Sequence, residues 1–344
     1  MIRTPVLRSI HDIPPKAHVI VRIDMDEPMK DGSVTDDDRL KKSIPTIKEL
    51  LEKQCVLLLL GHVGRPKGKD PQYSLGPIYR ALLPLIREST ATTVSDIFIE
   101  DVHDDAAIHA ACQTYSVLCF ENVRFWEGEE QNDPQFLQAL IHNADWYVND
   151  ALAVSHRRHR SVQLHHDLPT SYGIAFIREV QELMHVVENP THPVTVILGG
   201  AKKDKLTYVA GLAAIADHVL IGGKLPHLIS SDTIITDKFC IAALSDDGFD
   251  LNKHDIEIFT SIIKESKTII WAGAMGFFEN PQYREGTEKI ARAVVASGAY
   301  TILAGGDTEA SVSGLGEEEK ITVIASGGGM MLELLTKKSL PAWE

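Results

Sequence analysis

The chain has 344 residues, of which 44% are hydrophobic and 24% charged, and its formal net charge is -14. These values are typical of a soluble globular protein, and the length favours about two domains. The acidic balance argues against general binding of nucleic acid, which needs a broad basic face. It does not exclude a local basic cleft for a small anion.

Neither a membrane span nor a secretory signal is predicted. No apolar run reaches the roughly 20 residues that a bilayer requires, and the first fifteen residues lack an apolar core. The four cysteines form neither a CxxC pair nor a dense framework. We therefore expect a cytoplasmic protein with reduced thiols that does not bind membranes.

In the first half, apolar runs alternate with amphipathic stretches. The sequence predicts strands at 18–25, 55–62, 116–123 and 145–150, and helices at 39–54, with a break near Pro45, and at 134–144. Such alternation is typical of βαβ units and a parallel sheet.

The pattern begins again after a long predicted helix at 172–188. A strand followed by a glycine turn is predicted at 193–206, where a helix follows, and at 218–224, 267–276, 300–307 and 321–335. The sequence therefore predicts an α/β protein with two doubly wound, Rossmann-like parallel-sheet domains joined by the long helix. Ligands are expected at the carboxyl ends of the strands.

The residues that follow the strands differ between the halves. Charged groups follow the strands of the first half, namely Asp24, Asp26, His62, Arg65, Arg124 and Arg157. Basic side chains suit a compact anion. Glycines follow those of the second half, at 199–200, 222–223, 305–306 and 327–329. A glycine there is an ordinary tight turn or a place where phosphate or a flat base approaches the backbone, and four such turns favour a ligand site.

Segment 155–161, SHRRHRS, gathers three arginines and two histidines. Close cations repel unless something negative offsets them. The candidates are local carboxylates, nucleic acid or a small anion, and nucleic acid would need basic surface beyond this segment.

Two cations have local alternatives. Arg124 could pair with Glu121 or Glu127, and the acids at 36–38 could neutralise Arg39 or cap the helix that follows.

The second half holds a different set of candidates. GGAKKDKL (199–206) places three lysines at a helix start, where cations are unfavourable without an anion, but it has neither the P-loop nor the G-x-G-x-x-G spacing. Asp307 is either a helix cap or, beside a phosphate, a Mg²⁺ ligand. No HExxH or Cys/His quartet is present, so a structural zinc is not expected.

Taken in order, these stretches resemble the phosphoglycerate kinase family over nearly the whole chain. The matching motifs are VRIDMDEP, DDDRLKKSIPTI, GHVGRPKG, YSLGPI, FENVRFWEGEEQND, WYVNDALAVSHRRHRS, VILGGAKKDKL, WAGAMGFFE, GGD and SGGGMMLELL. The resemblance implies reversible phosphoryl transfer between 1,3-bisphosphoglycerate and ADP, giving 3-phosphoglycerate and ATP, with Mg²⁺.

The resemblance also implies roles for individual residues. Phosphoglycerate would be surrounded by Asp24, Asp26, Arg39, His62, Arg65, Arg124 and Arg157. The nucleotide would be held by Gly200, Ala201, Lys202, Lys205, Gly222, Gly223, Glu279, Gly305, Gly306, Asp307, Thr308 and Ser326, with Glu279 near the ribose and Asp307 on Mg²⁺. Charge on the transferring phosphoryl group would be offset by Arg39, Lys202 and the amides of Gly327, Gly328 and Gly329.

The implied domains are 1–171 for phosphoglycerate, 172–188 as connecting helix and 189–329 for the nucleotide, with 330–344 packing back on the first domain. The acceptor is an ionised carboxylate, so no general base is required. Two ligands on separate domains have to meet in a central cleft, and hinge closure around the helix is therefore expected. The family also favours a monomer that acts on small molecules.

The chain departs from the family pattern at several positions. Asp26 stands where Asn is usual, and an added carboxylate should weaken binding of an anionic substrate. Ala272 and Ala274 replace Asn and Pro, and the lysine motif is one residue shorter, which leaves Lys202 and Lys205 on one helix face. These departures motivate the alternative of a phosphoglycerate-binding or regulatory paralogue that has lost efficient transfer.

Two further cations have no family counterpart. Arg158 and Arg160 are expected to be solvated or in salt bridges. A second hypothesis is that their charge offsets that of Asp26.

Overall fold

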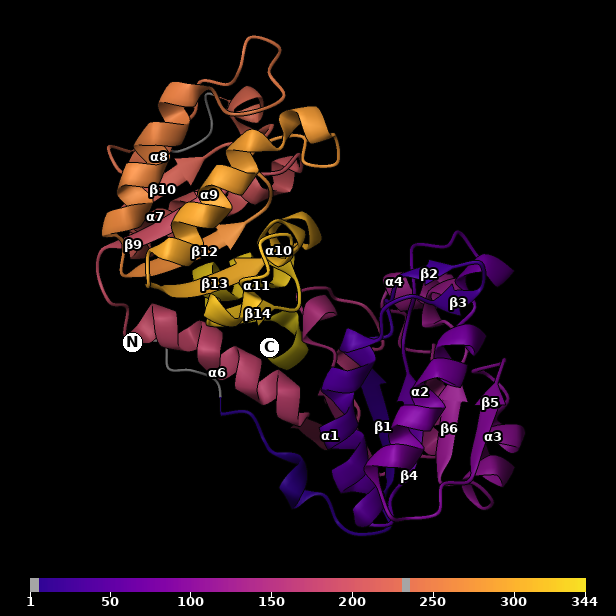
Figure 1. Ribbon diagram of the computed structural model, residues 1–344. Coiled ribbons are helices and arrows are strands. Elements are labelled where there is room, and N and C mark those ends of the chain that lie inside the picture. Colours follow the sequence, from indigo (N-terminus) through magenta and orange to yellow (C-terminus); the bar gives the residue numbers. More distant parts are fainter. Residues whose placement is uncertain (1–5, 231–235) are drawn as a thin grey trace. The chain divides into compact units, whose positions relative to one another are not determined.

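The computed structural model describes residues 6–230 and 236–344, which form two compact units (Figure 1). The N-terminal unit contains residues 6–178 and 340–344, and the C-terminal unit contains the described residues of 179–339. The boundary falls within helix α6 (Ile174–Glu188), which corresponds to the predicted long helix.

Six parallel strands form the sheet of the N-terminal unit. Their order is β5-β6-β4-β1-β7-β8, and Val19 of β1 lies opposite Leu57 of β4 and Trp146 of β7. The strands are β1 (His18–Ile23), β4 (Val56–Leu60), β5 (Asp96–Ile99), β6 (Val117–Phe120), β7 (Trp146–Asp150) and β8 (Thr170–Tyr172). A small hairpin is formed by β2 (Met29–Lys30) and β3 (Ser33–Val34).

Alternating side chains of β1 supply a core on each face of this sheet. Val19, Val21 and Ile23 pack with α1 and α2, whereas Ile20 belongs to the cluster that includes α3 and α5. The helices are α1 (Asp38–Glu52), α2 (Gly76–Ser89), α3 (Asp105–Cys112), α4 (Glu127–Glu130) and α5 (Gln138–His142), with 3-10 turns η1 (Ile10–Asp12), η2 (Pro71–Tyr73), η3 (Val123–Phe125), η4 (Leu152–Val154), η5 (Gln163–His166) and η10 (Pro341–Trp343).

The C-terminal unit contains a second parallel sheet of six strands, in the order β11-β10-β9-β12-β13-β14. This is the order of Rossmann-type sheets, in which the direction of winding reverses between β9 and β12. The strands are β9 (Val194–Leu198), β10 (His218–Ile221), β11 (Phe239–Ile241), β12 (Thr268–Ala272), β13 (Tyr300–Ala304) and β14 (Val323–Ala325).

Helices cover both faces of this second sheet. Phe259 of α8 and Ile290 of α9 pack with Trp271 of β12 on one face, and these two helices run side by side in Figure 1. Helix α7 packs on α11, where a Cβ at Gly211 would lie 2.7 Å from Thr336 Cβ. The helices are α7 (Val209–Ile215), α8 (Lys253–Glu265), α9 (Glu285–Ala296), α10 (Gly306–Ser313) and α11 (Gly328–Lys337), with η6 (Lys203–Tyr208), η7 (Leu225–Leu228), η8 (Pro281–Tyr283) and η9 (Glu318–Lys320).

The predicted fold class, two doubly wound parallel-sheet domains with a long helix, is confirmed. Within residues 6–230 and 236–344, none of the helices combines the length and apolarity that crossing a bilayer requires. Residues 340–344 group with the N-terminal unit, whereas α11 groups with the C-terminal unit.

Three local predictions were wrong. Helix α1 continues through Pro45 without a break, because Leu40, Ile47 and Leu50 are buried on both sides of the proline and hold the two halves in one core. The helix expected at 134–144 is only Gln138–His142. The helix expected after Gly200 begins as the 3-10 segment η6.

Candidate active site

Basic side chains meet at the carboxyl ends of the N-terminal strands. His62 follows β4, Arg124 lies in η3, and Arg157 follows η4. Burial, then Arg22 and Arg124, holds the pKa of His62 well below its usual value. Burial, then Arg22, lowers the pKa of Arg124 to about 10, and Arg157 lowers it as well. Neighbouring cations that lower the pKa values of His62 and Arg124 mark a place suited to an anion.

Arg22 belongs to this group, although it was not predicted. Its side chain is fully buried on β1 and donates to Ser161 Oγ at 3.0 Å, to the Ile23 carbonyl at 2.5 Å and to His62 Nδ1 at 2.7 Å. Buried Glu129 accepts hydrogen bonds from the Ser161 hydroxyl at 2.6 Å and amide at 2.8 Å. The signal in the sequence was a lone arginine inside an apolar strand, since a buried charge requires built-in partners.

Arg39 is held by acids that precede it by more than ten residues. Its Nη1 donates to Asp24 Oδ2 at 2.8 Å, and its Nε lies 4.0 Å from Glu27 Oε2. Burial raises the pKa of Glu27 to about 7, and the Leu40 amide donates to its Oε1 at 3.0 Å. The alternative in which the acids at 36–38 pair with Arg39 was therefore wrong.

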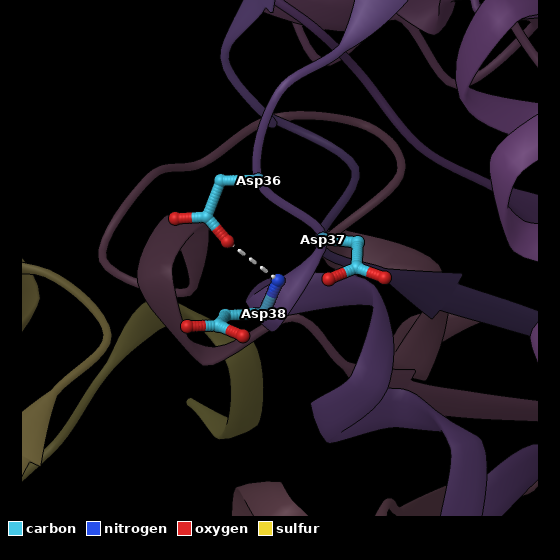
Figure 2. A group of neighbouring side chains, drawn as sticks. All are labelled: Asp36, Asp37 and Asp38. Atoms are coloured by element: carbon cyan, nitrogen blue, oxygen red, sulfur yellow. Dashed lines mark hydrogen bonds between the residues drawn. The ribbon is translucent and has the colours of Figure 1, made fainter.

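Those three acids form a group of their own at the start of α1 (Figure 2). Their carboxylate oxygens lie within 4.8 Å of one another, and Asp36 Oδ1 accepts the Asp38 amide at 3.0 Å. Lys41 Nζ lies 2.6 Å from Asp37 Oδ1 and 3.7 Å from Asp38 Oδ1. The three acids therefore lie at the start of α1, and the charge of Lys41, one turn later, partly neutralises theirs.

Asp26 and Arg124 hold the loop after β4 from two sides. Asp26 Oδ1 accepts the Gly64 amide at 2.8 Å, and Arg124 Nη1 donates to the Gly64 carbonyl at 2.7 Å. The Asp26 Oδ2 lies 3.9 Å from His62 Nε2. Asp26 thus lies within the cluster of His62, Arg124 and Arg157, which we call the basic group. Arg65 is exposed on the loop after β4.

Arg124 has no ion pair with Glu121 or Glu127 among the interactions of the described residues. Its nearest carboxylate is Glu130, at 3.9 Å from Nε. Glu121 instead accepts hydrogen bonds from the Ser74 hydroxyl and the Leu75 amide, both at 2.7 Å. The local alternative for Arg124 was therefore wrong.

The other two arginines of SHRRHRS are structural. Arg160 is buried, lies 2.7 Å from Asp167 Oδ2 and donates to the Phe136 carbonyl at 3.2 Å. Arg158 pairs with Glu344 at the end of the chain. The salt-bridge prediction is confirmed, and neither arginine pairs with Asp26 in the described part of the chain.

In the C-terminal unit, a pocket of about 520 Å³ opens at the carboxyl ends of β9, β10, β12 and β13. This edge includes the reversal between β9 and β12, where open α/β sheets bind ligands. Five predicted nucleotide residues line it, namely Gly200, Ala201, Gly223, Glu279 and Asp307. Sequence reasoning missed Lys224, His227, Asp247, Gly248, Phe249, Ala274, Gly276 and Phe277.

The glycine turns of this unit pack against one another at the pocket. A Cβ at Gly223, where φ is +59°, would lie 2.5 Å from the Gly200 nitrogen. The Gly200 amide donates to the Ala274 carbonyl at 2.7 Å, and the Gly223 amide donates to the Met275 carbonyl at 2.9 Å. These two amides therefore donate to carbonyls of the protein itself. Glycine is needed at this contact because the turns after β9 and β10 pack too closely for a side chain.

The two predicted lysines have different surroundings. Lys205 is largely buried and its Nζ donates to the Gly199 carbonyl at 2.8 Å and the Ala272 carbonyl at 3.0 Å. Burial, then Lys202, lowers its pKa to about 8. Lys202 is exposed. Lys205 thus connects β9 to β12, and Lys202 is the lysine that is open to a ligand.

Asp307 lies in the first turn of α10 and faces the pocket. Burial, then the charge of Glu279, raises its pKa, while Lys205 lowers it. Thr308 is buried and its hydroxyl accepts the Gly273 amide at 2.8 Å. Glu179 accepts hydrogen bonds from the Ser326 amide and hydroxyl. Asp307 and Glu279 are thus the two predicted acids that share this pocket.

The remaining predicted glycines precede helices. Gly305 and Gly306 form the turn into α10, and a Cβ at Gly306 would meet open space. Gly327 is the N-cap of α11, so the amides of Gly328 and Gly329 lie in its first turn. First-turn amides have no partner within their own helix and suit an anion.

Comparison with known proteins gives a consistent result. The family model described as phosphoglycerate kinase matches residues 11–233 and 230–338. A phosphoglycerate kinase of Finegoldia magna is 35% identical over 376 aligned positions that cover 94% of each chain. One of Akkermansia muciniphila is 33% identical over 390 positions, which cover 97% of this chain and 96% of the relative.

Solved structures show the same fold. A phosphoglycerate kinase of Pyrococcus horikoshii superposes with a TM-score of 0.80 at 24% identity, covering 98% of each chain. One of Coxiella burnetii gives a TM-score of 0.77 at 24% identity, covering 98% of this chain and 97% of the other. With the family model and the relatives above, this establishes that the chain belongs to the phosphoglycerate kinase family.

Proposed function

We propose that the chain catalyses reversible phosphoryl transfer between 1,3-bisphosphoglycerate and ADP, which gives 3-phosphoglycerate and ATP. The observation that carries this proposal is the group of basic side chains at the carboxyl ends of the N-terminal strands, in a chain that belongs to this family. Because burial, then Arg22 and Arg157, lower the pKa of Arg124, an anion that carries both carboxylate and phosphate relieves the repulsion among these cations.

In this proposal the N-terminal unit binds phosphoglycerate. Arg124 and Arg157 face its negative groups together with His62, and exposed Arg65 reaches it from the loop after β4. Arg39, which Asp24 orients, is directed at the transferring group. Asp26 reduces the net positive charge of the site and makes it weaker than a site with a neutral side chain.

The C-terminal unit binds ADP or ATP in the pocket at the ends of β9, β10, β12 and β13. Glu279 approaches the ribose, and exposed Lys202 reaches the phosphates. The first-turn amides of α11, at Gly328 and Gly329, stabilise the transferring phosphoryl group. Lys205, Thr308 and Ser326 support the pocket through the protein contacts described above.

Asp307 is the residue proposed to hold Mg²⁺ with the nucleotide. It fits the ion because it offers a hard carboxylate oxygen, and the neighbouring charge of Glu279 that raises its pKa favours a cation. Bound with the nucleotide, Mg²⁺ offsets negative charge on the phosphates.

The chemistry explains the absence of an obvious catalytic base. The acceptor is a carboxylate, already ionised near neutral pH, so no proton has to be removed. Positioning and neutralisation of charge remain. The two substrates are held by different units and have to be brought together for transfer, which is why we propose hinge motion around α6.

An assay with purified protein, 3-phosphoglycerate and Mg-ATP tests the function. Turnover is expected, and Lys202→Ala should reduce it strongly because a cation facing the phosphates is lost. The proposal fails if the natural chain is no faster than Lys202→Ala. No observation favours the alternative of an impaired regulatory paralogue, and calorimetry that finds phosphoglycerate binding without nucleotide binding would be needed to revive it.

The proposal takes the protein to be a cytoplasmic monomer that acts on small molecules rather than on nucleic acid or membranes. All four cysteines are free thiols, and three of them are buried. Light scattering after size exclusion measures the oligomeric state, and a dimer mass would contradict the monomer.

A further inference from the structure

The contact between Arg22 and His62 fixes the position of a proton. Arg22 Nη2 lies 2.7 Å from His62 Nδ1, within the core of the N-terminal unit. A guanidinium can only donate hydrogen bonds, so Nδ1 has to accept and carries no proton. The proton of the neutral imidazole is then on Nε2, the nitrogen that faces Asp26 Oδ2 at 3.9 Å.

Arg22 itself has no freedom to turn away from the histidine. Its other two nitrogens donate to Ser161 Oγ at 3.0 Å and to the Ile23 carbonyl at 2.5 Å. Ser161 is held by both carboxylate oxygens of Glu129. The chain Glu129–Ser161–Arg22–His62 therefore fixes one orientation of the guanidinium. Burial raises the pKa of Glu129, and the nearby charge of Arg22 acts against that rise.

The charges around His62 disfavour a second proton. Arg22 faces it from β1, Arg124 from η3, and Arg157 and His159 from the segment after η4, and each lowers its pKa further after burial has done so. Asp26, after β1, is the acidic group that faces it, at 3.9 Å, and is partly exposed to solvent. Among the described residues, cations thus lie near the His62 ring on three elements, and an acid on one.

We propose that Arg22 is a positioning residue that holds His62 as the neutral tautomer with its proton on Nε2. His62 then meets phosphoglycerate as a neutral hydrogen-bond donor and not as a cation. The part that concerns substrate rests on the proposed function, whereas the tautomer is a property of the free protein. A histidine that stays neutral donates the same hydrogen bond to phosphoglycerate throughout the pH range in which an ordinary histidine titrates.

Long-range ¹H–¹⁵N spectra of the free, ¹⁵N-labelled protein test the tautomer directly. The signals of the His62 ring are identified as those that are missing from the spectrum of the variant His62→Gln. We expect an unprotonated Nδ1, a protonated Nε2 and no titration between about pH 5.5 and pH 8. A proton on Nδ1, or titration within that range, would overturn the proposal even if no Arg22 variant folded.

Arg22→Met tests the role of the guanidinium, because it keeps the length of the side chain and removes every donor. His62 Nδ1 then loses the donor that fixes it as an acceptor, so the long-range spectra of the variant should show the proton distributed between Nδ1 and Nε2, while burial still disfavours a second proton. The Kd for 3-phosphoglycerate should rise, because part of the His62 population no longer carries its proton on Nε2. Arg22→Lys, which retains one donor, should restore part of the natural behaviour.

Tyr147→Phe is the matched structural control. The Tyr147 hydroxyl donates to the Ser161 carbonyl at 2.8 Å, and among the described residues it makes no hydrogen bond to His62. This variant should keep the natural tautomer, and equal effects in Tyr147→Phe and Arg22→Met would contradict the positioning role. If the spectra show the expected tautomer and 3-phosphoglycerate fails to bind, the proposed function is wrong and the positioning role stands.

Discussion

At the scale of single residues, Asp26 places a carboxylate within the proposed anion site. Its Oδ1 accepts the Gly64 amide at 2.8 Å. Burial acts to lower the pKa of Arg39, but the charge of Asp24, and then that of Asp26, raise it. The charge of Asp26 also acts against the lowering of the pKa of Arg124 by burial and Arg22. An amide at this position would keep the hydrogen bond to Gly64 and remove the charge. Asp26→Asn therefore separates the effect of the charge on anion binding from the effect of the hydrogen bond on the loop.

We predict that Asp26→Asn binds 3-phosphoglycerate about three- to tenfold more tightly at low salt, since one repulsive charge is removed near the anion. Calorimetry at two ionic strengths measures the effect, which should shrink as salt rises. Asp101→Asn, on the same unit but outside the basic group, is the control and should change nothing. An unchanged Kd in Asp26→Asn would show that this carboxylate does not weaken the site.

The buried carboxyl group of Asp150 should make the stability of the fold depend on pH. It is buried at the end of β7, and its Oδ1 accepts the Phe176 amide at 3.4 Å. Burial raises its pKa from 3.8 to about 7. The folded state therefore prefers the protonated form, so its stability is greatest at low pH and falls as pH rises from about 4 to 7.

The substitution Asp150→Asn should remove this dependence. From pH 5 to pH 8 the natural protein should lose about 2.5 kcal/mol of unfolding free energy relative to the variant. Urea unfolding of both proteins at the two pH values measures the difference. A parallel change in both would contradict the raised pKa. Asp145→Asn, which alters an exposed acid just before β7, is the control.

At the scale of elements, Lys202 is the N-cap of η6 and Lys205 lies within that segment, and the two lysines have different roles. Lys205 Nζ donates to carbonyls at the ends of β9 and β12. Lys205→Ala should therefore lower the unfolding free energy by about 2 kcal/mol, measured by urea unfolding. Lys202→Ala should leave stability within about 0.5 kcal/mol and reduce turnover. Equal stability of the two variants would contradict this division.

The turn after β10 is a second element on which the pocket depends. Gly223 and Gly298 have similar φ values, +59° and +65°, but a Cβ would meet Gly200 nitrogen at 2.5 Å in the first case and nothing within 4 Å in the second. Gly298→Ala should therefore cost only the left-handed backbone strain, about 1–2 kcal/mol. Gly223→Ala should cost more and also weaken ADP binding.

Unfolding curves and ADP calorimetry on both glycine variants make this comparison. Because the backbone strain is matched, any extra loss in Gly223→Ala reports the close approach of the turns after β9 and β10. Loss of ADP affinity in Gly298→Ala as well would show that general destabilisation, and not the pocket, is responsible.

At the scale of the whole molecule, the two sheets were predictable because their strands are short apolar runs that alternate with amphipathic segments. The strand ends then indicated His62, Arg124 and Asp307, since side chains after parallel strands share one edge. Arg22 was not predicted, because periodicity treats a strand residue as core whatever its charge. Phe249 lies in a loop without periodicity, so only three-dimensional contacts place it at the pocket.

The separation of the chain into two units leads to a prediction about both ligands. Arg157 faces the basic group of the N-terminal unit, and Lys202 is exposed beside the pocket of the C-terminal unit. Arg157→Met should therefore raise the Kd for 3-phosphoglycerate at least about tenfold and leave the Kd for ADP unchanged, since a charge-assisted contact contributes more than about 1.4 kcal/mol. Lys202→Met should do the reverse.

Calorimetry with each ligand on each variant gives four affinities and separates binding from turnover. Both variants should lose kcat for the complete reaction, because phosphoryl transfer requires both ligands in place whichever unit is altered. An Arg157→Met variant that loses ADP affinity, or a Lys202→Met variant that loses 3-phosphoglycerate affinity, would mean that the units do not bind their ligands separately. Retained turnover with weakened binding would instead show that these cations only capture substrate, and that the charge on the transferring group is met by Arg39 and the amides that begin α11.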